Sequence, residues 1–267
     1  MQHWLAALPA PAREVVAAVR DAAHEDERVL GVTVGGSAVV GSMDEFSDVD
    51  FTIVCTDDAH QELLAEAQNF AARVGRLLVA FTGEHVGEPR LLIALYGPPL
   101  LHVDLKFVSV SELATRVEDA LVVWERGGEL AAAMQATPAA WPQPDLQWIE
   151  DRFWVWIHYG AAKLGRGELF ECLDTLAALR GLVFGPLLAV LHGQRPQGVR
   201  RLERFAADAV PALEATLGDH TKAGCAAALR ASIALYRSLR EQLAEPDLVR
   251  RPEAEAAVVG YLDELLT

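Results

Sequence analysis

Hydrophobic and polar positions follow two different patterns in the two halves of the chain. In the first 110 residues, short apolar runs rich in Val, Leu and Ile stand between polar or glycine-rich stretches, a pattern that predicts β-strands. The five runs cover residues 29–34, 48–55, 77–82, 91–96 and 101–108. Residues 1–27, with Pro11 near a helix start, and the segment following Asp57 and Asp58 have helical spacing instead. A further helix is predicted from Ser111 to Trp124.

From residue 146 onward, apolar residues recur every three or four positions, which predicts helices throughout. The predicted helices cover residues 146–164, 168–192, 199–217, 221–244 and 252–266. Pro186 and Pro211 should kink or break the helices that contain them, because proline lacks the backbone N–H. The loops between these helices are short, which favours an antiparallel bundle.

Three prolines between the two patterns, Pro138, Pro142 and Pro144, mark a linker at 136–145. The sequence therefore predicts an α+β protein with a domain at 1–135 and an all-α domain at 146–267.

The composition excludes several other classes of protein. Of the 267 residues, 52% are hydrophobic and 23% are charged, which is typical of soluble globular proteins. The longest apolar run, at 181–191, is too short to span a bilayer, and the N-terminus has no basic region before an apolar core. We therefore expect a cytoplasmic protein with no membrane partner. The cysteines, Cys55, Cys172 and Cys225, lack metal-ligand spacing and are expected to be reduced core residues.

The net charge of −15 is concentrated in the first half of the chain. Residues 1–120 contain 8 Lys or Arg against 19 Asp or Glu, whereas residues 121–267 contain 15 against 19. Such a surface does not favour binding to a polyphosphate backbone, so a nucleic-acid partner is not expected. An acidic cleft would attract a cationic small molecule, although acidity can also serve solubility alone.

The stretch from Gly35 to Asp50 lies between two predicted strands and carries the candidate chemistry. Gly35 and Gly36 can adopt backbone angles closed to other residues, so their amide groups can converge on an anion, and Ser37 adds a hydroxyl. A helical turn beginning at Ser37 would direct free N–H groups at the same anion.

Asp48 and Asp50 stand two residues apart at the start of the second predicted strand. Strand alternation places both carboxylates on one face, with Val49 and Phe51 on the other. Two adjacent carboxylates repel each other unless a cation binds, and hard oxygen ligands suit Mg²⁺ that carries a nucleotide phosphate.

Gly-Gly-Ser, ten intervening residues and Asp-Val-Asp resemble the signature of the DNA polymerase β-like nucleotidyltransferase superfamily. That family has a third carboxylate on a later strand, and the matching residue is Asp104 in Leu-Leu-His-Val-Asp-Leu-Lys-Phe-Val. Alternation places His102, Asp104 and Lys106 on one face of this strand. The resemblance implies a mixed, antiparallel-rich sheet of five strands followed by a helical bundle.

The stretch that starts at Trp156 and contains Lys163 is similar to the first C-terminal helix of aminoglycoside and lincosamide nucleotidyltransferases. In that family a basic residue of this region meets the nucleotide phosphates, so Lys163 is the candidate here, with Arg180 as a weaker one. A solvent-exposed lysine near a helix C-terminus is the alternative for Lys163, since the helix dipole favours it. For Arg180 the alternative is an ion pair with Asp174 or Glu171.

Residues 83–90 connect two predicted strands and are rich in polar side chains. Such a connection can line a binding site, although hairpin loops are polar in any case. The candidate substrate-binding residues in it are Glu84, His85, Glu88 and Arg90.

The resemblance implies transfer of a nucleoside monophosphate, AMP from ATP, to a hydroxyl of a small molecule of the aminoglycoside or lincosamide type. Asp48, Asp50 and Asp104 would hold Mg²⁺, Asp104 would also accept the proton of the attacking hydroxyl, and Gly35, Gly36 and Ser37 would bind phosphates. Two alternatives stay open: adenylylation of a protein or nucleic acid, and a non-catalytic antitoxin-like or nucleotide-binding module. The protein is expected to be a monomer or a homodimer.

Overall fold

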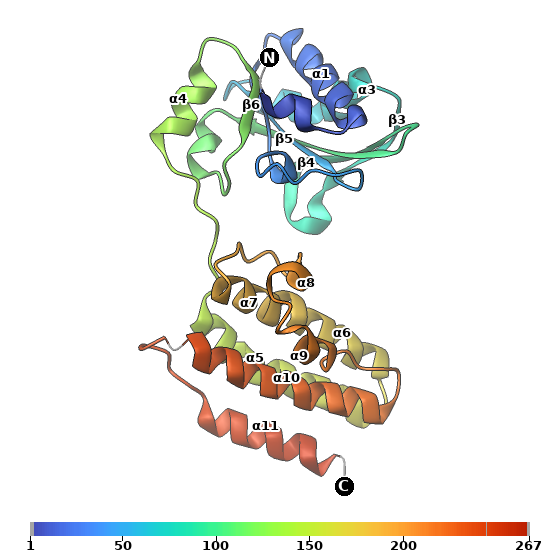
Figure 1. Ribbon diagram of the computed structural model, residues 1–267, viewed down its shortest axis with the longest axis vertical. Helices are drawn as coiled ribbons and strands as arrows, with labels where there is room; N and C mark the ends of the chain where they lie inside the picture. Colours follow the sequence, from blue (N-terminus) through green and yellow to red (C-terminus); the bar gives the residue numbers. More distant parts are fainter. Residues whose placement is uncertain (1–2, 244, 266–267) are drawn as a thin grey trace. The chain divides into compact units, whose positions relative to one another are not determined.

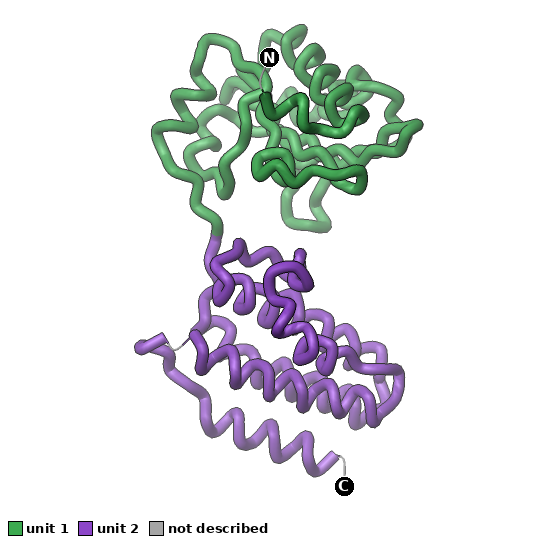
Figure 2. The backbone as a smooth tube through the Cα atoms, viewed as in Figure 1, with its two compact units in different colours: residues 1–141 green, residues 142–267 purple. Residues whose placement is uncertain are grey.

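The computed structural model describes residues 3–243 and 245–265, and the chain divides into two compact units, 1–141 and 142–267 (Figure 2). Each unit has its own hydrophobic core. The predicted helix ends at residues 1, 244 and 266 lie outside the described residues.

Unit 1 is built on one mixed sheet of six strands with the order β3-β4-β5-β2-β1-β6 (Figure 1). The strands are β1 (Val29–Val34), β2 (Val49–Cys55), β3 (Leu77–Gly83), β4 (Glu88–Tyr96), β5 (Leu101–Ser109) and β6 (Leu121–Glu125). The neighbours β2 and β5 are parallel, and all other neighbouring strands are antiparallel. The predicted α+β class is confirmed, with six strands rather than five.

The helices of unit 1 leave part of the sheet open. They are η1 (His3–Ala7), α1 (Ala10–His24), η2 (Gly36–Ala38), α2 (His60–Ala65), α3 (Ala67–Val74), η3 (Glu84–Val86), η4 (Ser111–Thr115) and α4 (Glu129–Ala136). α1 packs against β1, α2 against β5, and α3 against β3 and β4. The apolar residues of β2 and β5 on the helix-covered side, such as Phe51 and Phe107, are buried, whereas Asp50 and Asp104 alternate with them and stay half-buried.

The prediction of a helix over residues 111–124 is wrong. Only the 3-10 helix η4 forms there, and residues 121–125 become β6, which pairs antiparallel with β1. The edge of β1 offers unpaired backbone groups, and Val122 and Val123 are β-branched residues that suit a strand. Gly31 permits the close approach, because a Cβ at this position would lie 3.0 Å from the Trp124 carbonyl oxygen.

Unit 2 is entirely helical (Figure 1). Its helices are α5 (Leu146–Arg166), α6 (Leu169–Leu179), α7 (Gly185–Leu191), α8 (Leu202–Phe205), α9 (Val210–Glu214), α10 (Lys222–Leu243) and α11 (Pro252–Glu264). Between α6 and α7 the backbone makes a π-helical turn over Arg180–Phe184, just before Pro186, as expected where a proline interrupts the helical hydrogen bonds.

The predicted helix over residues 199–217 is also wrong, because α8 and α9 are two separate short helices. Pro211 stands in the first turn of α9, where its missing N–H costs nothing. Arg201, which immediately precedes α8, has a left-handed φ of 61° and so prevents a continuous helix from residue 199.

The helical run Leu169–Leu191 has the length and apolar composition that a membrane span would need. Cys172, Leu176 and Phe184 of this run are nevertheless buried in the core of unit 2. A core helix of this composition is weak evidence for a membrane segment.

Candidate active site

The Gly35–Gly36 turn is built against Asp50. The Gly35 N–H donates a hydrogen bond of 2.8 Å to the Asp50 carbonyl oxygen, which fixes the end of β1 beside the start of β2. Gly36 has φ of 59°, and a Cβ at this position would collide with Oδ2 of Asp50. Only glycine therefore fits at position 36 while the Asp50 carboxylate stays in place.

Ser37 follows this turn as the central residue of η2 and is only 9% exposed. Among the described residues, its Oγ has no hydrogen-bond partner. A buried hydroxyl without a partner is uncommon in folded proteins and indicates that a ligand or water supplies the missing hydrogen bond. This observation fits the predicted role of Ser37 in phosphate binding.

Asp50 and Asp104 stand directly beside each other in the two parallel strands, because the register pairs Asp50 with Asp104 and Thr52 with Lys106. Neighbouring strands lie about 4.8 Å apart, so these carboxylates can act on one ligand. Asp48 immediately precedes β2 and is half-buried. The predicted third carboxylate thus lies next to the Asp-Val-Asp pair.

Asp104 has an altered proton affinity. Its burial raises its pKa above the ordinary value, the positive charge of His102 and a hydrogen bond to that residue lower it, and the negative charge of Asp48 raises it again. The net shift is upward. His102 Nε2 lies 2.9 Å from Asp104 Oδ1, so the two side chains share one face of β5 as predicted. A carboxylate with a raised pKa is better suited to accept a proton than an ordinary aspartate.

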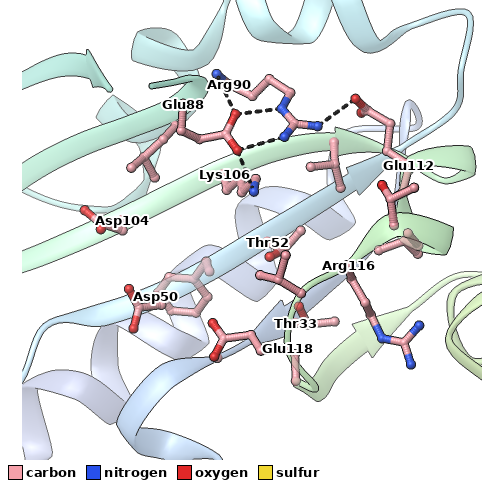
Figure 3. A pocket seen from close by; sticks show the side chains of 18 of the residues that line it. Thr33, Asp50, Thr52, Glu88, Arg90, Asp104, Lys106, Glu112, Arg116 and Glu118 are labelled. Atoms are coloured by element: carbon pink, nitrogen blue, oxygen red, sulfur yellow. Dashed lines mark hydrogen bonds and ion pairs between the residues drawn. The ribbon is translucent and has the colours of Figure 1, made fainter. Parts of the chain in front are cut away.

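The strands β2 and β5 form the floor of a cavity of about 620 Å³ in unit 1 (Figure 3). The stretch that follows β5, from Glu112 to Ala120, forms one of its walls. The polar residues that line the cavity are Thr33, Asp50, Thr52, Glu88, Arg90, Asp104, Lys106, Glu112, Thr115, Arg116 and Glu118.

The four candidate substrate residues separate into two pairs. Glu88 and Arg90 line the cavity, but they belong to β4 and not to a loop, so the prediction of a connecting loop up to residue 90 is wrong. Glu84 hydrogen-bonds to Thr82, and the His85 ring lies 5.7 Å from that of Phe81. Neither Glu84 nor His85 is among the residues that line the cavity.

Glu118 is a cavity residue that the sequence analysis missed. A Cβ on Gly35 would lie 3.5 Å from Glu118 Oε1 and 3.9 Å from the Cβ of Asp50, so both side chains flank Gly35. The wrong prediction of a helix over 111–124 gave no reason to place Glu118 near Gly35, and no local pattern relates the two residues. The strand character of residues 121–125 was the available signal.

Lys163 lies in the last turn of α5 in unit 2. Its ammonium donates to Glu168 at 2.7 Å and is paired with Glu171 as well, and these bonds raise its pKa. Arg180 donates to the Thr216 carbonyl oxygen at 2.8 Å, and within the described part of the chain no ion pair joins it to Asp174 or Glu171.

The described residues contain no ready-made group of three or more His, Cys, Asp or Glu placed to bind a metal. Mg²⁺ does not need one, because it is commonly held by one or two carboxylates together with substrate phosphates. The adjacent Asp50 and Asp104, both oxygen donors lining one cavity, fit that kind of ligand set.

A scan against protein-family models finds no match, and neither does a search of curated protein sequences. Several solved structures resemble the chain over nearly its whole length, and three of them are described here. An aminoglycoside 6-adenyltransferase from Bacillus subtilis is 16% identical, with 97% of this chain and 99% of that one covered and a TM-score of 0.38. A nucleotidyltransferase-like protein from Exiguobacterium sibiricum is 14% identical, with 94% and 90% covered and a TM-score of 0.40.

The third is a spectinomycin adenyltransferase from Enterococcus faecialis, solved with ATP and spectinomycin. It is 12% identical, with 95% and 97% covered and a TM-score of 0.29. These structures are of the class that the sequence motif resembles.

Proposed function

We propose that unit 1 carries the active site of a nucleotidyltransferase that moves AMP from ATP to a hydroxyl group of a small molecule. One observation carries this proposal: the register of β2 and β5 places Asp50 beside Asp104, directly against the Gly35–Gly36 turn. Adjacent carboxylates next to a phosphate-binding turn provide what phosphoryl transfer needs, which is positioning and charge stabilisation.

The turn would bind the terminal phosphates of the nucleotide. The backbone of Gly36 lies against the Asp50 carboxylate, and the hydroxyl of Ser37, which has no partner among the described residues, would donate to a phosphate oxygen. Asp48, Asp50 and Asp104 would hold Mg²⁺, which supplies neutralisation of phosphate charge when bound.

Asp104 would also accept the proton of the attacking hydroxyl. The acceptor oxygen then forms a bond to the α-phosphorus while the bond to the leaving pyrophosphate breaks in line with it. Burial supports this role, because it raises the pKa of Asp104 and so favours proton uptake.

The acceptor is a small molecule of the aminoglycoside or lincosamide type, as the motif resemblance implies. A cavity of about 620 Å³ has the size of a small-molecule site. An enzyme that modifies such antibiotics would work in the cytoplasm and confer resistance.

The test is a screen for pyrophosphate release with ATP or GTP, Mg²⁺, and a panel of aminoglycosides and lincosamides. We expect release with at least one acceptor and ATP. We also expect Mg-ATP at millimolar concentration to raise the melting temperature, and Asp50→Asn to reduce that rise. If the intact protein shows no pyrophosphate release with any acceptor and no Mg-nucleotide shift in melting temperature, the proposal is refuted.

A further inference from the structure

Four charged residues of the cavity form a continuous chain of ion pairs, called here the paired-charge wall: Glu88, Arg90, Lys106 and Glu112 (Figure 3). Lys106 Nζ lies 2.7 Å from Glu88 Oε2, and Arg90 Nε lies 2.7 Å from Glu88 Oε1. Arg90 Nη1 then lies 2.7 Å from Glu112 Oε1. Two carboxylates and two cations therefore neutralise each other.

This wall is held in place from several elements. Glu88 and Arg90 belong to β4, Lys106 to β5 and Glu112 to η4, and the second oxygen of Glu112 accepts a 2.8 Å hydrogen bond from the Ser109 N–H. All four side chains are between 22% and 34% exposed, so they are partly shielded from water. Hydrogen bonding from Arg90 lowers the pKa of Glu88 to about 2, so this carboxylate stays ionised.

The sheet order places the wall on the acceptor side of the cavity. The phosphate-binding turn follows β1, and the strands succeed one another as β4-β5-β2-β1. The turn is thus on the β1 side of Asp50 and Asp104, whereas Glu88 and Arg90 of β4 are on the other side. A nucleotide bound at the turn leaves the β4 side for the second substrate.

A neutral wall recognises hydroxyl groups better than ammonium groups. An ammonium would have to displace Lys106 or Arg90 from a carboxylate at 2.7 Å, and it would be repelled by the cation displaced. A hydroxyl can accept from the remaining N–H groups of Lys106 and Arg90 and donate to Glu112 Oε1, which accepts one bond from Arg90, without breaking any pair.

We propose that the paired-charge wall is an acceptor subsite that binds an uncharged, hydroxyl-bearing part of the second substrate and rejects ammonium groups. The inference rests on the proposed function, because it takes the cavity as the acceptor site. It assigns Glu112 to hydroxyl recognition and Glu88 to holding Arg90 and Lys106 in place, and neither to attraction of a cation.

The experiment compares pairs of aminocyclitols in which one non-reacting hydroxyl is replaced by an ammonium, one carbon at a time. Dissociation constants are measured by titration calorimetry on the full chain without nucleotide or metal. For at least one carbon, the wild-type protein should bind the hydroxyl member about tenfold more tightly, as one charge-assisted contact permits. Arg90→Met should reduce or invert that ratio at the same carbon, because it leaves Glu88 and Glu112 short of a cation.

Two further variants keep the test decisive. Lys106→Met should shift the ratio in the same direction, since it also removes a cation from Glu88, and it serves if Arg90→Met fails to fold. Arg20→Met removes an arginine that pairs with Asp21 at 2.8 Å on the surface of α1, and should leave the ratio unchanged. Equal binding of both members at every carbon, no binding of any pair, or the same shift in Arg20→Met would overturn the inference.

The binding measurement separates this inference from the proposed reaction. Protein that shows the hydroxyl preference and its loss in Arg90→Met, but releases no pyrophosphate with any acceptor, would refute the reaction and retain the subsite. Protein that releases pyrophosphate but binds hydroxyl and ammonium members equally would retain the reaction and refute the subsite.

Discussion

Gly36 is the residue on which the geometry of the candidate site depends most directly. Its left-handed φ of 59° and the proximity of Asp50 Oδ2 exclude any side chain for two separate reasons, backbone strain and collision. Gly41 offers a comparison within the same stretch, because its φ is 66° but a Cβ there would meet nothing within 4 Å.

We expect Gly36→Ala to abolish AMP transfer and Gly41→Ala to retain it. In both variants an alanine in the left-handed backbone region destabilises the fold by about 1 kcal/mol, but only Gly36→Ala displaces the Asp50 carboxylate. Pyrophosphate release and the Mg-ATP melting shift measure the difference. Equal losses of transfer in both variants would mean that backbone strain alone, and not Asp50, accounts for the effect.

Substitution of Asp104 should distinguish metal and nucleotide binding from proton transfer. We expect Asp104→Asn to keep the fold and to bind Mg-ATP through Asp48 and Asp50, while transfer falls by roughly 10²- to 10⁴-fold because the general base is lost. Single-turnover kinetics and a Mg-ATP melting shift measure the two effects. Transfer within a few-fold of the wild type would rule out Asp104 as the base.

At the scale of the element, α5 is anchored by a carboxylate near its N-terminal end. Glu150 is fully buried, and it accepts hydrogen bonds from Tyr236 at 2.6 Å, from the Arg251 N–H at 3.0 Å and from Arg240 at 3.1 Å. Burial by itself raises the pKa of Glu150, but these bonds, a bond from Trp154 and the charge of Arg240 outweigh it, so the net pKa is lowered. This carboxylate ties α5 to α10 and to the start of α11.

Glu150→Gln should lower the free energy of unfolding by about 2 kcal/mol at pH 7, because it removes charge-assisted hydrogen bonds in the core and leaves Glu255 as the carboxylate partner of Arg240. A carboxyl with a lowered folded-state pKa stabilises the protein above its unfolded pKa, ordinarily 4.5, and loses this contribution as pH falls through the folded value. The stability gap between the wild type and the variant should therefore narrow below about pH 4.5. Urea unfolding between pH 3 and 7 measures it.

The neighbouring Asp151 is the matched control for this effect. It lies on the same helix and pairs with Arg251 at 2.7 Å, but both side chains are substantially exposed. Asp151→Asn should change stability little, since solvent screens such pairs. If the difference in unfolding free energy between the wild type and Glu150→Gln does not change with pH, Glu150 is not ionised in the core.

At the scale of the whole molecule, the prediction for unit 2 concerns Lys163. Its ammonium is paired with Glu168 and Glu171, so a nucleotide phosphate would have to compete with two carboxylates for it.

We expect Lys163→Ala to raise the KM for ATP by about tenfold, the scale of one charge-assisted contact, with little change in melting temperature. Arg166→Ala is the control, because Arg166 lies in the same last turn of α5 but is 67% exposed. Steady-state kinetics with varied ATP give the comparison. A variant that melts early but has normal activity per folded molecule would assign Lys163 a purely structural role.

Local sequence patterns determined which face of a strand the candidate residues occupy and which segments are helical. The alternation of Asp50 with Val49 and Phe51 predicted the face of β2 on which this carboxylate lies, because side chains alternate along any strand whatever surrounds it. The same reasoning placed His102 and Asp104 together. Helical periodicity likewise identified unit 2 as helical, since each helix must bury an apolar stripe.

The tertiary structure decided what depends on contacts between distant segments. Residues 121–125 became a strand because β1 had an unpaired edge, and Glu118 reached Gly35 only through that strand. The ion pairs of the paired-charge wall join β4, β5 and η4, and no spacing in the sequence specifies them. Local patterns fix which face a side chain occupies, whereas its partners depend on which strands and helices become neighbours, and that is set by the burial of the whole core.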